Sequence, residues 1–179
     1  MNKLIKEGGN VFKSPKGGSA TIRIKRDDVD PTLQWLEDKV LNFDGDKKLY
    51  LKKHKLGTTG KKETSGDLDI AIDENKVSKD DLIKKLIAWV NENHPELDLA
   101  NSSEKEIKKK VSQWVAKTGV SVHFKTPIRG DEANGFVQTD LMFGDPKFML
   151  WSVKGEPGNE YRGRDRQLLI NAIATHLGS

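Results

Sequence analysis

Residues 55–73 read KLGTTGKKETSGDLDIAID, and this stretch decides the fold. A turn-rich loop leads into DLDIAID, in which polar and apolar residues alternate as in a strand with one buried face. Successive side chains of a strand point to opposite faces, so Asp67 and Asp69 share one face. The apolar residues Leu68, Ile70 and Ile72 lie on the other face. We therefore predict a strand over residues 67–72 that buries its apolar side and presents two carboxylates.

The rest of the chain mixes strands and helices without a βαβα repeat, which is typical of the α+β class. Strands are predicted over residues 21–25 and 49–56, and a pair of strands over residues 120–125 and 136–143. Helices are predicted to begin at Asp30-Pro31, as N-cap and first-turn proline, and after the capping signals at Ser78 and Ser103. The last of these is expected to continue through Trp114 and end near Gly119. A closing helix is predicted over residues 162–177.

Composition limits the class of protein. The chain has 179 residues, a formal net charge of +4, a pI of about 9.1 and no cysteine. Disulfides and thiolate chemistry are therefore excluded, and a mildly basic surface suits nucleotides or nucleic acid without requiring them. No secretory signal and no long apolar segment is present, so we expect a soluble cytoplasmic protein without membrane contact. We divide it into an N-terminal arm, residues 1–20, and one domain, residues 21–179.

The loop GTTGKK does not fit a phosphate-binding Walker motif. That motif requires four residues between its glycines and a Ser or Thr after the lysine. Here Gly57 and Gly60 are three positions apart, and Lys62 stands where the hydroxyl residue belongs. The loop is better interpreted as the lead-in to the two aspartates.

A third carboxylate would complete a metal site. Asp140 lies in the predicted strand over residues 136–143, and its neighbours Thr139 and Leu141 point to the opposite face. Clustered carboxylates repel one another, and such clusters typically hold a divalent cation with oxygen ligands. Nucleotidyl transfer uses two Mg²⁺ or Mn²⁺ ions about 3.5–4 Å apart. The residues Asp67, Asp69 and Asp140 are thus candidates for both the metal ligands and the catalytic groups.

These motifs resemble the DNA polymerase beta type nucleotidyltransferase superfamily. The run L-G-T, a gap of eight residues, D-L-D-I and a later strand aspartate follow the order of that family's signature, over roughly residues 49–144. More narrowly, LGTTGKKETSGDLDIAID is similar to stretches of predicted nucleotidyltransferases of tailed bacteriophages, which would place the protein in the cytoplasm of the host cell. The resemblance implies a small mixed sheet with helices packed on one face. The family usually has Ser or Gly where this chain has Thr58.

The resemblance also implies roles for the loop residues. Gly57 would let the backbone approach the triphosphate, and Thr58 would offer its hydroxyl and amide to a terminal phosphate. Asp67 and Asp69 would bind both metals, and Asp140 would bind the catalytic metal and help activate the acceptor hydroxyl.

Other candidate residues are suggested by the sequence, and each has two interpretations. Lys61 and Lys62 either contact the triphosphate as point charges or are solvated loop lysines. Arg162 and Arg166 share one face of the predicted closing helix, where they either pair with acids or bind phosphate. His123 either borders the cleft or, as is commoner, is a partly exposed strand histidine.

The predicted function is a metal-dependent transfer of a nucleoside monophosphate from an NTP to a hydroxyl acceptor. The sequence does not identify the acceptor, which is an RNA or DNA end, a protein or a small molecule. It also leaves two alternatives for the chain itself, a minimal enzyme or a catalytic-domain fragment. Two alternatives are a non-catalytic module that binds nucleotide or nucleic acid on the same fold, and an accessory phage protein with coincidental motifs.

Overall fold

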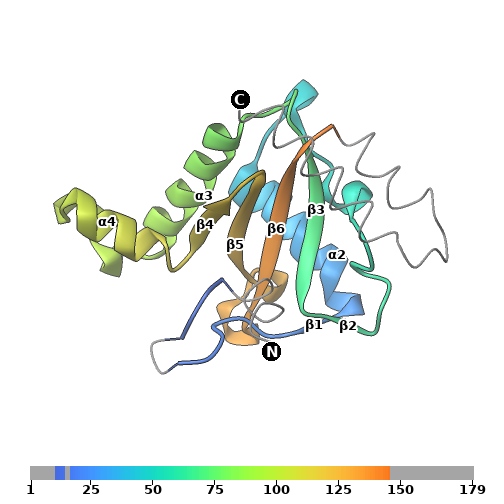
Figure 1. Cartoon of the computed structure of the whole chain (residues 1–179), viewed down its shortest axis with the longest axis horizontal. Helices are drawn as coiled ribbons and strands as arrows, with labels where there is room; N and C mark the ends of the chain where they lie inside the picture. Colours follow the sequence, from blue (N-terminus) through green and yellow to red (C-terminus); the bar gives the residue numbers. More distant parts are fainter. Residues whose placement is uncertain (1–10, 15–16, 146–179) are drawn as a thin grey trace.

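A four-stranded mixed sheet forms the centre of the protein (Figure 1). The computed structural model describes residues 11–14 and 17–145. The strands are, in spatial order, β3 (Asp67–Asp73), β6 (Phe136–Gly144), β5 (Ser121–Pro127) and β4 (Val115–Thr118). β3 and β6 run parallel, whereas the β6–β5 and β5–β4 pairs are antiparallel. A separate two-stranded ladder joins β1 (Ile24–Lys25) to β2 (Thr64–Ser65). The predicted α+β class is confirmed.

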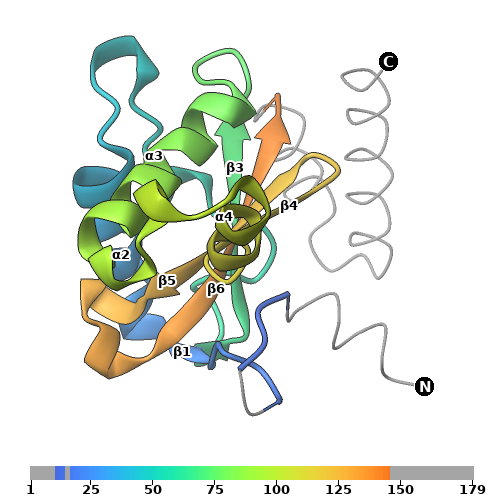
Figure 2. The same ribbon diagram turned by 90° about the vertical axis from the view of Figure 1, so that its left-hand side faces the viewer.

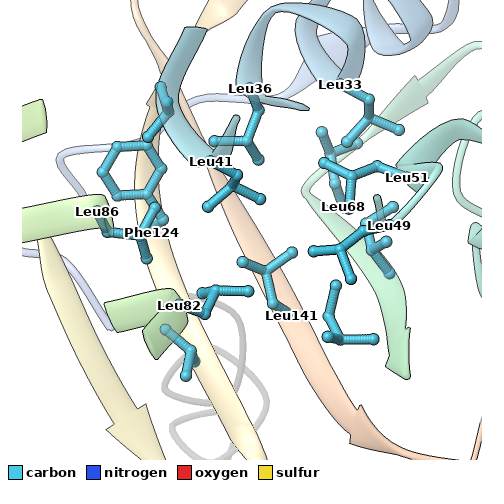
Figure 3. Close-up of a cluster of buried hydrophobic side chains, with 14 of the residues drawn as sticks. Leu33, Leu36, Leu41, Leu49, Leu51, Leu68, Leu82, Leu86, Phe124 and Leu141 are labelled. Carbon is cyan, nitrogen blue, oxygen red and sulfur yellow. The ribbon is translucent and has the colours of Figure 1, made fainter. Parts of the chain in front are cut away.

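Helices α2 (Arg26–Trp35) and α3 (Lys79–Asn93) pack on one face of this sheet (Figure 2). The apolar side of β3 is fully buried beneath them. Figure 3 shows how leucines from α2 and the segments after it meet leucines of α3 and the sheet residues Leu68, Phe124 and Leu141. This apolar layer fixes which face of the sheet is covered by helices, and the three aspartates lie on the opposite side of their strands.

Two capping predictions are confirmed. The Ser78 hydroxyl accepts a hydrogen bond from the Asp81 amide at 3.0 Å and begins α3. Ser103 and Glu106 form a reciprocal capping box at the start of α4 (Glu104–Val111), with both of its hydrogen bonds present. Each serine accepts from a backbone amide that the first turn of a helix leaves without an intrahelical partner.

The predicted start of the first helix at Asp30-Pro31 is wrong. α2 begins at Arg26, and Pro31 lies inside it. The Arg26 amide donates to the Glu63 carbonyl at 2.9 Å, and Asp27 lies in the first turn, where a negative charge favours a helix N-terminus. Tertiary contact with the β2 region therefore begins the helix one turn before the proline. The chain then continues into a π-helical turn (Leu36–Leu41) and ends in a left-handed Asn42.

The predicted strand over residues 49–56 is also wrong. Tyr50 adopts a left-handed conformation, and a 3₁₀ turn (Leu51–His54) follows it. The cause is Glu37, whose side chain is buried and accepts hydrogen bonds from the amides of Tyr50 and Leu51 at 2.7 and 2.8 Å. Two backbone donors are thereby drawn away from any sheet ladder. Only Lys55 pairs with β3, as a single antiparallel bridge to Ile70.

The helix predicted to run to Gly119 ends at Val111. Residues Val115–Thr118 form β4 instead, in which Val115 pairs with Phe124 of β5. Trp114 is buried, and its carbonyl accepts from the Lys125 amide at 2.9 Å. Pairing with the open edge of β5 satisfies backbone groups that a longer helix would have satisfied internally.

The remaining predictions concern the two ends of the chain. Within the predicted arm, Phe12 is buried, and the Val11 amide donates to the Gln138 side chain at 2.9 Å. The strand predicted over residues 21–25 is shorter, since only Ile24–Lys25 pairs. The helix predicted over residues 162–177 lies outside the described residues. Within residues 11–14 and 17–145, no helix has the length and apolar character needed to cross a membrane.

Candidate metal centre

Three aspartates meet on the face of the sheet opposite α2 and α3. β3 and β6 are parallel neighbours in a register that places Asp69 opposite Asp140, and Asp67 lies two residues earlier on the same face. One carboxylate oxygen from each residue lies within 4.8 Å of the others. Asp67 and Asp69 are half-buried and Asp140 is buried. The three side chains therefore lie together, as the alternation of their strands predicts.

The carboxylate of Asp140 is held in position by two hydrogen bonds. His123 Nδ1 lies 2.6 Å from Asp140 Oδ1, and Gln138 Nε2 donates to the same oxygen at 2.9 Å. His123 comes from β5, where it pairs directly with Asp140, and Gln138 precedes Asp140 on the same face of β6. Because both bonds use Oδ1, the other carboxylate oxygen can serve an ion. Fixing the orientation of a ligating carboxylate in this way is characteristic of metal sites.

The position of His123 differs from its prediction as a partly exposed residue. The residue is buried, at 7% exposure, and Nε2 lies 2.7 Å from the Thr118 hydroxyl. An imidazole protonated at Nδ1 satisfies both contacts, since Nε2 then accepts from the hydroxyl. The available sequence signal was its place on the polar face of a strand predicted to pair with the strand of Asp140. His123 is buried through its contact with β4, a segment that the sequence predicted to be helical.

The loop before β3 is attached to the backbone of Asp69. The Leu56 amide donates to the Asp69 carbonyl at 2.7 Å, and the Asp69 amide donates to the Thr59 hydroxyl at 3.0 Å. Between these contacts Gly57 has a φ of +59°, a left-handed conformation that glycine adopts without strain. The loop thus follows the outer edge of β3 beside the aspartates.

The loop side chains divide into one that faces inward and three that face solvent. Thr59 is buried, whereas Thr58, Lys61 and Lys62 are exposed. Thr59 was missed because two adjacent threonines give no sequence signal for which one turns inward. The predicted residues Arg162 and Arg166 lie outside the described part of the chain.

A hollow of about 310 Å³ opens near the far end of this loop, between Lys55, Gly60 and the first turns of α2. Its walls carry Arg26 as well as Asp27 and Asp30, so its charge is mixed. Lys55 Nζ lies 2.7 Å from Asp30 Oδ1 and is engaged there. The lining includes none of the three clustered aspartates.

The electrostatics of the cluster favour a divalent cation. Three carboxylates within 4.8 Å repel one another when ionised, and a cation between them removes that repulsion. Oxygen-only ligands are the set preferred by Mg²⁺ and are also used by Mn²⁺. The donor set thus fits the metal that the sequence predicted, and the apolar layer behind β3 keeps the strand in register.

Comparisons with models of known protein families, with curated proteins and with solved structures gave no match. The resemblance to the nucleotidyltransferase superfamily therefore depends on the motif residues alone.

Proposed function

We propose that the protein is a metal-dependent nucleotidyltransferase, which transfers a nucleoside monophosphate from an NTP to a hydroxyl acceptor. The observation that carries this proposal is the convergence of Asp67, Asp69 and Asp140 within 4.8 Å across two parallel strands. The order of the motifs along the chain supports it, since the glycine loop precedes the first pair of aspartates and packs against their strand.

Each described residue of the site has a chemical task in this proposal. Asp67 and Asp69 would hold the two divalent ions, Mg²⁺ or Mn²⁺, and Asp140 would hold the catalytic one of them. When bound, these ions supply charge neutralisation at the phosphates and lower the pKa of the acceptor hydroxyl. Gly57 and Thr58 bind the terminal phosphates through backbone and hydroxyl groups, and Lys61 and Lys62 add positive charge beside them.

The bond changes define the products. The acceptor oxygen bonds to the α-phosphorus, and the bond from that phosphorus to the oxygen of the β-phosphate breaks, which releases pyrophosphate. The carboxylate of Asp140 receives or orients the hydroxyl proton, and His123 and Gln138 position that carboxylate through Oδ1. In this proposal Arg162 and Arg166 bind phosphate, a role that stays a prediction.

The test is incubation of the protein with each α-labelled NTP, Mg²⁺ or Mn²⁺, and total RNA, DNA or protein as acceptors. We expect transfer of label and release of pyrophosphate by the wild type. Asp69→Asn and Asp140→Asn should reduce both by at least about 100-fold, because each loses a metal ligand. Asp80→Asn, an exposed acid on α3, is the matched control and should keep full activity.

Two results would refute the proposal. One is activity of Asp140→Asn equal to that of the wild type. The other is binding of NTP by the wild type with no pyrophosphate release on any acceptor, which would favour the non-catalytic binding module.

A further inference from the structure

A second surface, formed by residues that the transfer reaction does not use, surrounds Tyr50. The side chain of Tyr50 is 42% exposed, which makes it one of two large exposed hydrophobic residues in the described chain. The ammonium groups of Lys48, Lys53 and Lys76 lie 5.5, 5.3 and 5.2 Å from the centre of its ring. We call these four residues the Tyr50 platform.

The lysines of the platform are not engaged by carboxylates of the described residues. In the part of the chain that the structure describes, none of its three lysines forms an ion pair. Lys76 Nζ donates instead to the Lys48 carbonyl at 2.9 Å. The surrounding sequence, KKLYLKKHK over residues 47–55, holds five lysines, one histidine and no acidic residue. An aromatic ring and several lysines that form no ion pair in the described residues therefore share one small surface.

The fold holds Tyr50 in an outward position. Tyr50 has φ +54° and ψ +56°, a conformation that costs free energy for any residue with a side chain. The buried Glu37 carboxylate stabilises it by accepting hydrogen bonds from the Tyr50 and Leu51 amides. The neighbours Leu49 and Leu51 are buried on either side. The tyrosine is thus held between two buried leucines with its own side chain exposed.

We propose that the Tyr50 platform binds single-stranded nucleic acid. Surfaces that bind unpaired strands combine aromatic side chains, on which bases stack, with cations that contact the phosphates. A duplex keeps its bases inside the stack and offers them to no such ring, so the tyrosine specifically favours a single strand. DNA and RNA present the same phosphates and unpaired bases, and the experiment separates them.

The position of the platform is compatible with a strand that reaches the aspartates. Lys76 of the platform follows the carboxyl end of β3, the edge strand that carries Asp69. The four residue steps from Asp69 to Asp73 extend about 13 Å at the usual rise of a strand. The inference does not depend on the proposed transfer, because the two sites use different residues. If both hold, the bound strand is the acceptor.

The test is fluorescence anisotropy of labelled 12-nucleotide oligo(U) and oligo(dT), with a 12-base-pair duplex as comparison, over a series of KCl concentrations. We expect the wild type to bind the single strands more tightly than the duplex. Tyr50→Gly keeps the left-handed backbone without strain and removes the ring, so it should weaken binding at least about fivefold. Tyr50→Phe retains the stacking face and should bind like the wild type.

The lysines are tested through the salt dependence. Each phosphate contact on a single strand contributes about −0.7 to the slope of log K against log salt. Lys48→Gln combined with Lys53→Gln should therefore make the slope less steep by about 1.4. The control is Lys108→Gln combined with Lys109→Gln, which changes the charge equally on the exposed side of α4 and should leave the slope unchanged. Circular dichroism checks that each variant is folded.

Four results would overturn the inference. They are no binding by the wild type at 50 mM KCl, equal affinity of Tyr50→Gly and Tyr50→Phe, tighter binding of duplex than of single strands, or displacement of the oligonucleotide by phosphatidylserine vesicles. A preference between oligo(U) and oligo(dT) identifies the strand as RNA or DNA and supports the inference either way. Oligonucleotide binding is measured in chelator and without NTP, so failure of the transferase proposal is distinguishable from failure of this one.

Discussion

Replacement of Glu37 by glutamine tests whether this buried carboxylate determines the conformation of residues 49–54. Both of its oxygens accept a backbone amide, at 2.7 Å from Tyr50 and 2.8 Å from Leu51, and its side chain is 5% exposed. A carboxamide has one accepting oxygen, so the other amide would face an NH₂ donor. A buried amide left without an acceptor costs about 1–3 kcal/mol, and the remaining bond loses its charge assistance, about 1 kcal/mol more.

We therefore expect Glu37→Gln to lower the free energy of unfolding by about 2–4 kcal/mol. Domains of this size have a total stability of about 5–15 kcal/mol, so the loss is readily measured by urea denaturation with circular dichroism. The control is Asp38→Asn, an adjacent exposed carboxylate, which should change stability by less than about 0.5 kcal/mol. If Glu37→Gln were as stable as Asp38→Asn, the carboxylate would not hold this segment, and the outward position of Tyr50 would need another cause.

Two further substitutions test local packing and the attachment of the loop. Gly130→Ala would place its new methyl group 2.4 Å from the ring of Trp35 at a φ of +77°, so it should lower the free energy of unfolding, measured by urea denaturation, by about 2–4 kcal/mol. The control is Gly45→Ala, which has φ +59° and open space around it and should lower that free energy by about 1 kcal/mol. Equal losses in the two variants would contradict this packing. Thr59→Val removes the hydroxyl that accepts a hydrogen bond from the Asp69 amide, so it should lower the free energy of unfolding by about 1–2 kcal/mol and weaken Mn²⁺ binding. Thr59→Ser keeps the hydroxyl and should retain both stability and Mn²⁺ binding. A Thr59→Val protein with wild-type stability and Mn²⁺ affinity would contradict this role of the hydroxyl.

The parts of the fold that could be predicted from the sequence are those whose signals are local. Alternation identified β3, β5 and β6, and the serine capping signals identified the starts of α3 and α4. Each of these patterns is set by residues close together in the chain, so no knowledge of distant partners is needed.

The wrong predictions share a non-local cause. Trp114 and Val115 continue the apolar spacing of the helix that contains Ile107, yet pairing with β5 makes Val115 the first residue of a strand. The strand predicted over residues 49–56 failed because Glu37, more than ten positions earlier in the chain, binds its amides. Neither partner is visible in a window of sequence.

The candidate site also contains residues that local sequence signals identify and residues whose contacts are non-local. The grouping of Asp140 with Asp67 and Asp69 follows from alternation in two strands together with the order of the motifs. The supporting residues His123 and Thr59 could not be assigned, because their contacts depend on the register of three strands and on the turn of a loop.

The most direct test of the central claim, that the three aspartates bind a divalent ion, is thermal unfolding with Mg²⁺, Mn²⁺ or chelator. An ion that binds only the folded state adds about 2.7 kcal/mol at 100 times its Kd, which corresponds to a rise in Tm of roughly 5–11 °C for a chain of this length. We expect that rise for the wild type and for Asp80→Asn. Asp69→Asn should lose most of it and should melt in chelator at the wild-type temperature or higher, because one of three repelling charges is gone. The claim would be contradicted by a wild-type protein whose Tm ignores both ions, with and without NTP, while Asp69→Asn is plainly less stable in chelator.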